Sequence, residues 1–597
     1  MQIQPGYRIT EQSGFPRQRR FAAHSVVITL SALSFAVLSA TAHANRGNTH
    51  GFSLAATSAV DYTSTPHAAM TDCAALTALA GGGVTMTAEV VPADEGVPAH
   101  CRVKGNIPAE IGFEVNLPLQ WNGRLFMFGN GGFAGEDAEA PGEVEGRVAG
   151  LRAGFATART DTGHLASKEP LGTFAYQQIN KVEDHGYRAV HETVVLAKQL
   201  IDTFYARPPS YSYWQGCSTG GRQGMMAASK YPDDFDGIAA AAPTLRWSDV
   251  MMKGLSNQMA LDDAPTLTHA KLGTVFEAVL ARCDAKDGVV DGLLADPSQC
   301  DFDPVRDLPR CTGAVNDSCF TEAETTALAK IRQGPTIKGR NYFPQYPGME
   351  EASTARTWIR NPDGSPNVLT VFGESYMKYM FFLPEQDPDY DWKTFDFDTD
   401  PDRMTMINDL WNPKPTLEAF KARNGKILTY WGLADAALNP IMGTDYYAEV
   451  ADRMGGVEQV QDFYRMYMVP GVAHCSGGYG PDEIDAMTPL IEWVEAGKTP
   501  DRLLAQKTVD GQLKYNRAIC PHPQATVYQS GDPELPESYT CVSPGDTPDE
   551  PTPGEDEYTG GGGGCTVSAS ARDASLPVLV LMALAGVLYR RRGRKQH

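Results

Sequence analysis

The chain has 597 residues, of which 42% are hydrophobic and 21% are charged, and its formal net charge is −22. This composition is that of an ordinary globular protein with a large core, and the length allows roughly two to four domains. Because the body of the chain carries no basic patch, the charge excludes nucleic acid as a partner.

The first 44 residues have the pattern of a secretory signal peptide. A basic region at 17–20 precedes an apolar stretch at 26–38, and a small-x-small site follows at 42–44. We expect cleavage after Ala44. The apolar stretch is shorter than the roughly 20 residues of a membrane span, so a retained anchor is the weaker interpretation.

Strand-like and helix-like segments alternate in the first half of the body. Buried strands are expected at 124–129 and 154–160, a long helix at 186–204, and a further strand and helix at 211–215 and 222–230. Such alternation predicts a mostly parallel sheet covered by helices, which is the α/β class.

A G-x-S-x-G turn lies between that last strand and helix. It consists of Gly216, Cys217, Ser218, Thr219 and Gly220. Glycines at both ends allow a sharp turn from strand to helix, which exposes the serine hydroxyl at the helix N-terminus. The pattern predicts a nucleophile elbow; a serine that only makes a turn is the alternative.

The segment after the elbow, 244–423, is far longer than a connection between neighbouring βα units. It predicts a second domain, a lid inserted between the two parts of an α/β-hydrolase domain at 45–243 and 424–541. The lid is rich in aromatic residues, most of which we expect in its own core, with one or two facing the site: Tyr376, Tyr379, Phe381, Phe382 and Trp392.

An acidic loop in this lid carries Asp284, Asp287 and Asp291 directly after Cys283. Glycines between the carboxylates permit tight turns, and a loop that offers carboxylate and carbonyl oxygens suits a hard cation such as calcium. The spacing does not match an EF-hand. A solvated acidic turn is the alternative to a calcium site.

The chain order of three residues points to a hydrolase triad. Asp435 follows a buried-strand pattern at 426–432, and His474 comes later with Cys475 as its direct neighbour. Serine, aspartate and histidine occur in this order in α/β-hydrolases. If Cys217 and Cys475 pair, the disulfide holds Ser218 against His474.

Each of these residues has a less specific interpretation. Asp435 is also compatible with a cap at a strand end, in which case Asp445 is the nearest substitute. A structural role is the alternative for His474. His164 is a further histidine that we expect to support the core rather than to act as a base.

The end of the chain predicts a linker and a sorting tail. The predicted linker, 542–564, is rich in proline, acidic residues and glycine, and its segment 544–556 has no apolar side chains to bury. In 565–597, Cys565 is followed by a short apolar segment at 576–589 and a basic cluster, which is a stop-transfer pattern. A permanent anchor is the alternative, and Cys565 is either a processing or lipid-attachment site or an incidental thiol.

The motifs around Ser218, Asp435 and His474 resemble those of the tannase and feruloyl esterase family, and the tail resembles bacterial C-terminal protein-sorting tails. The likeness runs from about Cys73 to Cys541, through segments 121–124, 129–135, 157–164 and 389–392. The resemblance implies a secreted serine esterase of the α/β-hydrolase fold with a large inserted lid.

The same resemblance implies five disulfides and a structural calcium ion. The implied pairs are Cys73 with Cys101, Cys217 with Cys475, Cys283 with Cys300, Cys311 with Cys319, and Cys520 with Cys541. In the acidic loop it implies side-chain ligands from Asp284, Asp287 and Asp291 and carbonyl ligands from Val289 and Leu293. No organic cofactor is expected.

The predicted chemistry is ester hydrolysis through an acyl-enzyme. His474 activates Ser218, Asp435 orients the imidazole, and the oxyanion is stabilised by the amide of Thr219 and by that of Gly131 or Gly132. Three function classes remain open. They are an esterase for feruloyl or galloyl esters, a hydrolase of other aromatic or aliphatic esters, and a catalytically silent surface-binding module.

The expected partners follow from these predictions. The substrate is a small aromatic ester or an ester-decorated polysaccharide, and the membrane is contacted only through the sorting tail, with an intramembrane sorting protease as a partner. The expected location is the cell surface or the medium after removal of the signal peptide.

Overall fold

The computed structural model describes residues 51–404 and 406–545. The described residues belong to one compact unit. The predicted signal peptide, the sorting tail and most of the linker lie outside the described residues. Within the described part of the chain, none of the helices has both the length and the apolar character that crossing a membrane requires.

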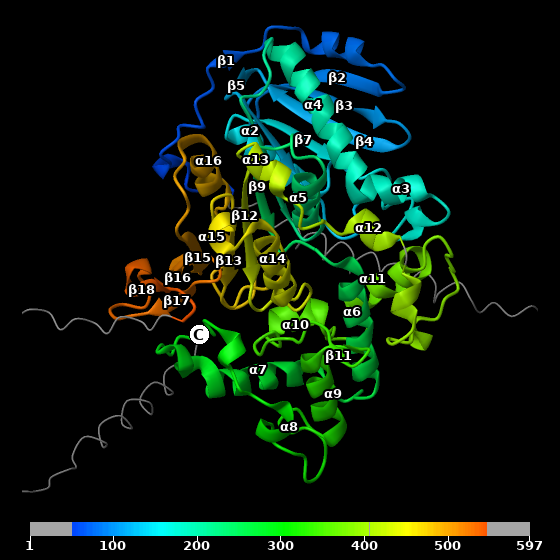
Figure 1. Cartoon of the computed structure of the whole chain (residues 1–597), viewed down its shortest axis with the longest axis vertical. Helices are drawn as coiled ribbons and strands as arrows, with labels where there is room; N and C mark the ends of the chain where they lie inside the picture. Colours follow the sequence, from blue (N-terminus) through cyan, green and yellow to red (C-terminus); the bar gives the residue numbers. More distant parts are fainter. Residues whose placement is uncertain (1–50, 405, 546–597) are drawn as a thin grey trace, which may run out of the picture. The chain divides into compact units, whose positions relative to one another are not determined.

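A nine-stranded sheet forms the centre of this unit, in the order β13-β12-β9-β8-β6-β7-β4-β3-β2 (Figure 1). The six strands from β13 to β7 are parallel, and β4, β3 and β2 extend the sheet as an antiparallel meander. The strands are β2 (Thr85–Val91), β3 (His100–Ile107), β4 (Ile111–Pro118), β6 (Arg124–Phe128), β7 (Ala156–Thr160), β8 (Tyr211–Cys217), β9 (Gly237–Ala241), β12 (Lys426–Gly432) and β13 (Tyr464–Val469).

The predicted α/β class is confirmed, and the local predictions differ from the structure mainly at their ends. The expected strands 124–129 and 154–160 become β6 and β7, whose side chains are almost all buried, as parallel strands covered on both faces require. The expected helix 186–204 begins with a π-helical turn and continues as α4 (Ala189–Tyr205).

Helices cover both faces of the sheet. On one face, α2 (Pro141–Arg152) packs so closely that a Cβ at Gly146 or Gly150 would come within 2.8 Å of Phe128 or 2.7 Å of Phe126. On the other face, α5 (Thr219–Lys230) packs against Trp214 through Gly224. Also packed on the sheet are α4, α14 (Pro440–Met454) and α16 (Met487–Ala496).

Between β9 and β12 the chain leaves the sheet and forms mainly helices. They are α6 (Trp247–Asp262), α7 (His269–Cys283), α8 (Pro304–Asp307), α9 (Glu322–Gln333), α10 (Ala352–Trp358), α11 (Val368–Tyr376), α12 (Ile407–Trp411) and α13 (Glu418–Ala422), with a hairpin of β10 (Thr336–Ile337) and β11 (Arg340–Asn341). This segment corresponds to the predicted lid, 244–423. It belongs to the same compact unit as the sheet, so the domain boundaries stay a prediction.

Smaller elements complete the described part of the chain. A three-stranded sheet and a hairpin follow the central sheet: β14 (Glu483–Ile484), β15 (Leu503–Val509), β16 (Gln512–Ile519), β17 (Ala525–Tyr528) and β18 (Tyr539–Val542). The remaining elements are β1 (His67–Ala68), β5 (Gln120–Trp121), α3 (Ile179–Glu183) and α15 (Val457–Gln461).

Candidate active site

Ser218 lies on a strained turn between β8 and α5. Its backbone angles are φ 61° and ψ −119°, a conformation that a residue with a side chain adopts only when its surroundings impose it. The turn is packed tightly enough to require glycines, since a Cβ at Gly216 would lie 2.6 Å from the backbone of Gly220. The predicted elbow therefore has the expected strand-turn-helix context.

Asp435 and His474 form a buried pair beside this turn. The Nδ1 atom of His474 lies 2.8 Å from Oδ2 of Asp435, and both side chains are almost fully buried. The other carboxylate oxygen, Oδ1, accepts the amides of Ala437 and Leu438 at 2.9 and 2.8 Å. Since a carboxylate oxygen accepts hydrogen bonds, Nδ1 is the donor of this pair, and Nε2 of His474 is the ring nitrogen outside it.

The loops that carry this pair approach each other closely. β12 ends at Gly432, where a Cβ would lie 2.1 Å from the carbonyl oxygen of Val472, in the loop that leads to His474. Glycine at this strand end lets the histidine loop lie against the aspartate loop. The two loops thus bring together residues that are distant from Ser218 in the sequence.

All five predicted disulfide pairs are joined in the structure. Cys217–Cys475 has an S–S distance of 2.04 Å and links the residue before Ser218 to the residue after His474. This covalent link between nucleophile turn and histidine loop is independent of the packing around them.

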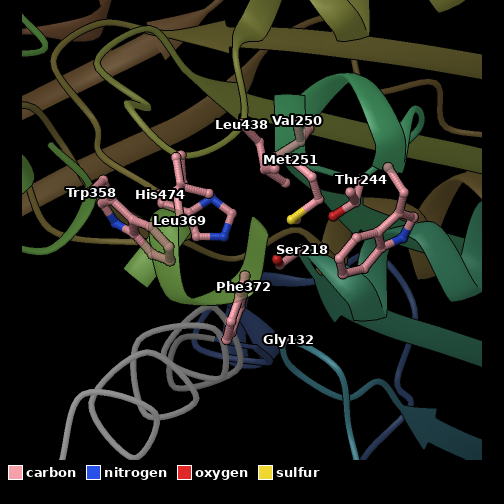
Figure 2. Close-up of a pocket in the computed structure, with 12 residues that line it drawn as sticks. Gly132, Ser218, Thr244, Val250, Met251, Trp358, Leu369, Phe372, Leu438 and His474 are labelled. Atoms are coloured by element: carbon pink, nitrogen blue, oxygen red, sulfur yellow. The ribbon is translucent and has the colours of Figure 1, made fainter. Parts of the chain in front are cut away.

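Ser218 and His474 open into one small pocket, of about 30 Å³, between the strand ends and the lid. Figure 2 shows both side chains pointing into it. The sheet side is completed by Gly132, Ala437 and Leu438. The lid side is formed by Thr244, Trp247, Val250, Met251, Trp358, Leu369 and Phe372.

The lid wall next to His474 is aromatic. The ring of Trp358 lies edge-on to the imidazole, with 5.0 Å between the ring centroids and 84° between the planes. None of the five lid aromatics singled out from the sequence is a lining residue of this pocket. Trp358 and the other wall residues carry no spacing or motif that would have identified them.

The glycine-rich loop 129–135 approaches Ser218 from the side of β6. Gly132, with φ 51°, lines the pocket, and its carbonyl oxygen accepts the hydroxyl of Thr219. The amide of Gly131 is already donated to Oε1 of Glu136 at 2.8 Å. Of the two glycines predicted as oxyanion donors, Gly131 therefore has its amide engaged by Glu136, and Gly132 is the one that lines the pocket.

The alternative residues lie in other surroundings. Asp445 is a half-exposed residue of α14 and lies 3.9 Å from Arg246. His164 is buried and stacks on Phe174 with 4.0 Å between the ring centroids, and burial lowers its pKa to about 3. His164 therefore remains neutral and serves packing, which agrees with its expected place in the core.

One charged side chain near the pair was not identified from the sequence. Lys253 of α6 is buried, and its Nζ lies 3.4 Å from the carbonyl oxygen of Ala436, beside Asp435. Burial lowers the pKa of Lys253 to about 8, although the Asp435 carboxylate opposes this shift. The lid thus brings a cation close to the buried carboxylate.

The acidic loop of the lid is held by its own backbone donors. Asp284 accepts the amides of Asp291 and Gly292, and Asp287 accepts that of Val289. Arg517 donates to Asp291 at 2.6 Å. The all-oxygen donor set suits calcium, but no group of three or more potential ligands converges in the described residues.

Comparison with known proteins identifies the family. The family described as tannase and feruloyl esterase matches residues 96–542. The chain belongs to this family. The chain is therefore a carboxylic ester hydrolase, and the substrate class that the family supports is esters of aromatic acids.

Three relatives illustrate the similarity. The chain is 31% identical over 518 residues to mono(2-hydroxyethyl) terephthalate hydrolase of Piscinibacter sakaiensis. This match covers 75% of the chain and 85% of the relative. It is 30% identical over 476 residues to feruloyl esterase B of Aspergillus niger, with 74% and 86% covered. The crystal structure of feruloyl esterase B from Aspergillus oryzae matches 79% of this chain and 100% of its own, with a TM-score of 0.69 and 26% identity.

Proposed function

We propose that this tannase-family esterase hydrolyses feruloyl-type esters through a triad of Ser218, His474 and Asp435. The observation that carries the proposal is the buried His474–Asp435 hydrogen bond of 2.8 Å beside a serine on a strained elbow, in one pocket. A catalytically silent binding module would have no use for this arrangement.

The reaction follows from the places of these groups. Nε2 of His474 takes the proton of the Ser218 hydroxyl as its oxygen attacks the ester carbonyl, while Asp435 stabilises the imidazolium. The tetrahedral intermediate then expels the alcohol, which receives that proton. Water, deprotonated by the same histidine, attacks the acyl-enzyme, and the acid leaves as Ser218 regains its proton.

The oxyanion requires two donors near the serine. The amide of Thr219 follows the nucleophile at the start of α5, where the helix dipole also favours negative charge. For the second donor we favour Gly132 over Gly131, because the Gly131 amide is taken up by Glu136. Loss of one such donor typically lowers kcat by about 100- to 1,000-fold.

The lid wall supports a neutral, largely apolar acyl group. Apart from the triad members, Thr244 provides the one hydroxyl among the pocket's lining side chains, and none of the lining residues is charged. The three hydroxyls of a galloyl group would find few hydrogen-bond partners in this pocket. Burying unpaired hydroxyls is costly, so such a site disfavours galloyl esters relative to feruloyl esters. We therefore expect feruloyl esters to react faster than galloyl esters.

The cavity volume favours a second candidate, a hydrolase of short aliphatic esters. About 30 Å³ is little more than the space of one water molecule, so every acyl group requires lid side chains such as Met251 or Phe372 to move aside. A short aliphatic acyl group requires the smaller displacement and an aromatic one the larger. The family supports the aromatic substrates, and the cavity as described supports the aliphatic ones.

A substrate panel distinguishes these candidates. We expect the highest kcat/KM with methyl ferulate, a lower value with methyl gallate, and no turnover of either by Ser218→Ala. A preference for aliphatic esters by tenfold or more over methyl ferulate would make the second candidate the function. Activity of Ser218→Ala well above about one thousandth of the wild type would reject the triad.

We also propose that the protein is exported and that its tail directs sorting. The basic and apolar segments before Ala44 and the segment 576–589 with its basic cluster support this proposal. Mass spectrometry of the native product tests it. We expect an N-terminus at Asn45 and loss of the chain from the apolar segment onward; an intact His597 in a membrane fraction would indicate a permanent anchor.

A further inference from the structure

The loop 129–135 that carries Gly132 has little conformational preference of its own. Four of its residues are glycines, and Gly132 and Gly135 have positive φ angles of 51° and 82°. Glycine restricts the backbone less than any other residue, so the shape of such a loop is set by what surrounds it. The contacts of the loop therefore decide which amide faces Ser218.

Three of these contacts come from two residues of α5, the helix that begins next to Ser218. Gln223 accepts the backbone amide of Asn130 at 3.1 Å and donates to the Asn130 side chain at 3.1 Å. Thr219 donates its hydroxyl to the carbonyl oxygen of Gly132. The peptide group between Asn130 and Gly131 is not held by any of these three hydrogen bonds.

Glu136 supplies the missing contact. Its Oε1 accepts the amide of Gly131 at 2.8 Å, and its Oε2 accepts Nδ2 of Asn130 at 3.2 Å. The peptide amide of Gly131 is thereby directed at a buried carboxylate. The next amide along the chain, that of Gly132 on the pocket wall, is left for the substrate.

We propose that Glu136 is a positioning residue, which holds the glycine-rich loop in the form that presents the Gly132 amide to the oxyanion. The proposal rests on the proposed function, because it assigns Glu136 a part in the same ester hydrolysis. Glu136 touches neither substrate nor Ser218 in this role and acts through Gly131.

The structure keeps Glu136 in place at an electrostatic cost. Arg159 donates through Nη2 to the backbone carbonyl of Glu136 at 2.8 Å and through Nε to the carboxylate of Glu143. Asp161 is a third buried carboxylate near this guanidinium. Burial raises the pKa of Glu136 and raises that of Glu143 to about 7. Among the described residues, Arg159 is the one cation that lowers the pKa of Glu136. A buried carboxylate in such surroundings contributes little to stability, so the hydrogen bonds that it directs are the better explanation for its presence.

Both carboxylate oxygens of Glu136 accept hydrogen bonds from the loop. Glu136→Gln replaces one of these acceptors by a donor and therefore tests whether the hydrogen bonds hold the loop. In Glu136→Gln the side chain keeps its size, but its NH2 group must face either the Gly131 amide or the Asn130 side chain, and both are donors. The mismatch leaves the loop free to adopt other forms. We expect kcat to fall by about 10- to 100-fold with KM changed less than twofold, because a misplaced oxyanion donor affects the transition state.

Asp161→Asn is the matched control. Asp161 is also a buried carboxylate near Arg159, but it accepts the amides of Gly112 and Gly163 and does not contact the loop. The three proteins are compared by kcat and KM for methyl ferulate, or for the best ester of the panel, well below their melting temperatures. Affinity for a phenylboronic acid, which forms a tetrahedral adduct with the serine, is measured in parallel.

The proposal predicts that Glu136→Gln loses kcat and boronic acid affinity together, whereas Asp161→Asn retains at least half of both. A wild-type kcat in Glu136→Gln, or an equal loss in the two variants, would overturn it. If Glu136→Gln does not fold, Glu136→Asp repeats the test with the charge kept and the reach shortened; failure of both to fold would make Glu136 structural and also overturn the proposal.

The outcome for the proposed function is read separately. Ser218→Ala is included in every experiment, and its inactivity supports the triad whatever the Glu136 variants do. An active Ser218→Ala would reject the proposed function, and the assignment of Glu136 with it. An inactive Ser218→Ala beside a fully active Glu136→Gln rejects the positioning role alone.

Discussion

The sheet side and the lid side of the pocket hold their side chains by different forces. Ser218, His474 and Asp435 are fixed by a disulfide, by directed hydrogen bonds and by a strained turn. Trp358 and Met251 on the lid side are held mainly by packing among apolar neighbours. Proton transfer requires a fixed distance and angle between donor and acceptor, which hydrogen bonds and covalent links provide. Selection of the acyl group depends on the size and shape of the pocket, which side-chain packing determines.

The comparison predicts the largest effect for the nucleophile itself. Ser218→Ala removes one hydroxyl and little volume, so we expect turnover to fall below about one thousandth of the wild type with an unchanged melting temperature. Initial rates on the preferred ester and a thermal melt measure the two quantities. Residual activity well above that level would place the nucleophile elsewhere.

The disulfide next to the triad should affect activity more than stability. In Cys217→Ala with Cys475→Ala, we expect kcat to fall by about 100-fold, because a shift of about 1 Å in catalytic groups has an effect of that size. The matched control is Cys311→Ala with Cys319→Ala, which removes a lid disulfide far from Ser218 in the sequence. For each double variant, the loss of kcat is compared with the fall in melting temperature. If the ratio of the two is the same in both variants, the Cys217–Cys475 disulfide has no special role in positioning the catalytic groups.

Enlarging the lid side should change substrate preference and leave the chemistry intact. Met251→Ala widens the pocket next to Ser218, so we expect the ratio of kcat/KM for methyl ferulate over a short aliphatic ester to rise by about tenfold. Met252→Ala is the control, since Met252 is equally buried on α6 but does not line the pocket. An unchanged ratio in Met251→Ala would show that this wall does not select the acyl group.

The buried carboxylates next to the glycine-rich loop 129–135 predict that the stability of the protein depends on pH. The pKa of Glu143 is raised by burial from 4.5 to about 7, so the folded protein binds more protons than the unfolded chain between these values. Its contribution to stability therefore falls as the pH rises from 4.5 to 7, by about 3 kcal/mol.

Denaturant unfolding at several pH values tests this sign. The stability of Glu143→Gln relative to the wild type should improve as the pH rises through this window. Glu89→Gln, at an exposed position of β2, should show no such trend. A relative stability of Glu143→Gln that stays constant or declines with pH would contradict the assignment.

The smallest expected effect concerns the acidic loop of the lid, where calcium remains our proposal. If calcium binds the folded loop, excess chelator should lower the melting temperature by about 4 °C and added calcium should restore it. Asp291→Asn should abolish the response. An unchanged melting curve together with no metal by elemental analysis would leave a solvated acidic turn, closed by Arg517.

Local patterns predicted the elements that hold the chemistry. The elbow around Ser218, the strand before Asp435 and the cysteine beside His474 are all short motifs, whose geometry depends on neighbouring residues. The antiparallel strands β2 to β4 and the sheet of β15 and β16 were not predicted. Two of them, β2 and β15, are partly exposed and lack the apolar run that identifies β6.

The sequence by itself determined the fold class, the family and the order of the proposed triad, because glycines, cysteines and buried strands impose their geometry locally. Only the tertiary structure decided which glycine amide is engaged and which lid residues form the pocket wall. Gly131 and Gly132 look alike in the sequence, and Glu136 distinguishes them by one hydrogen bond. Trp358 and Met251 reach Ser218 only because the lid folds over the strand ends, and contacts between residues so far apart in the chain leave no local pattern to read.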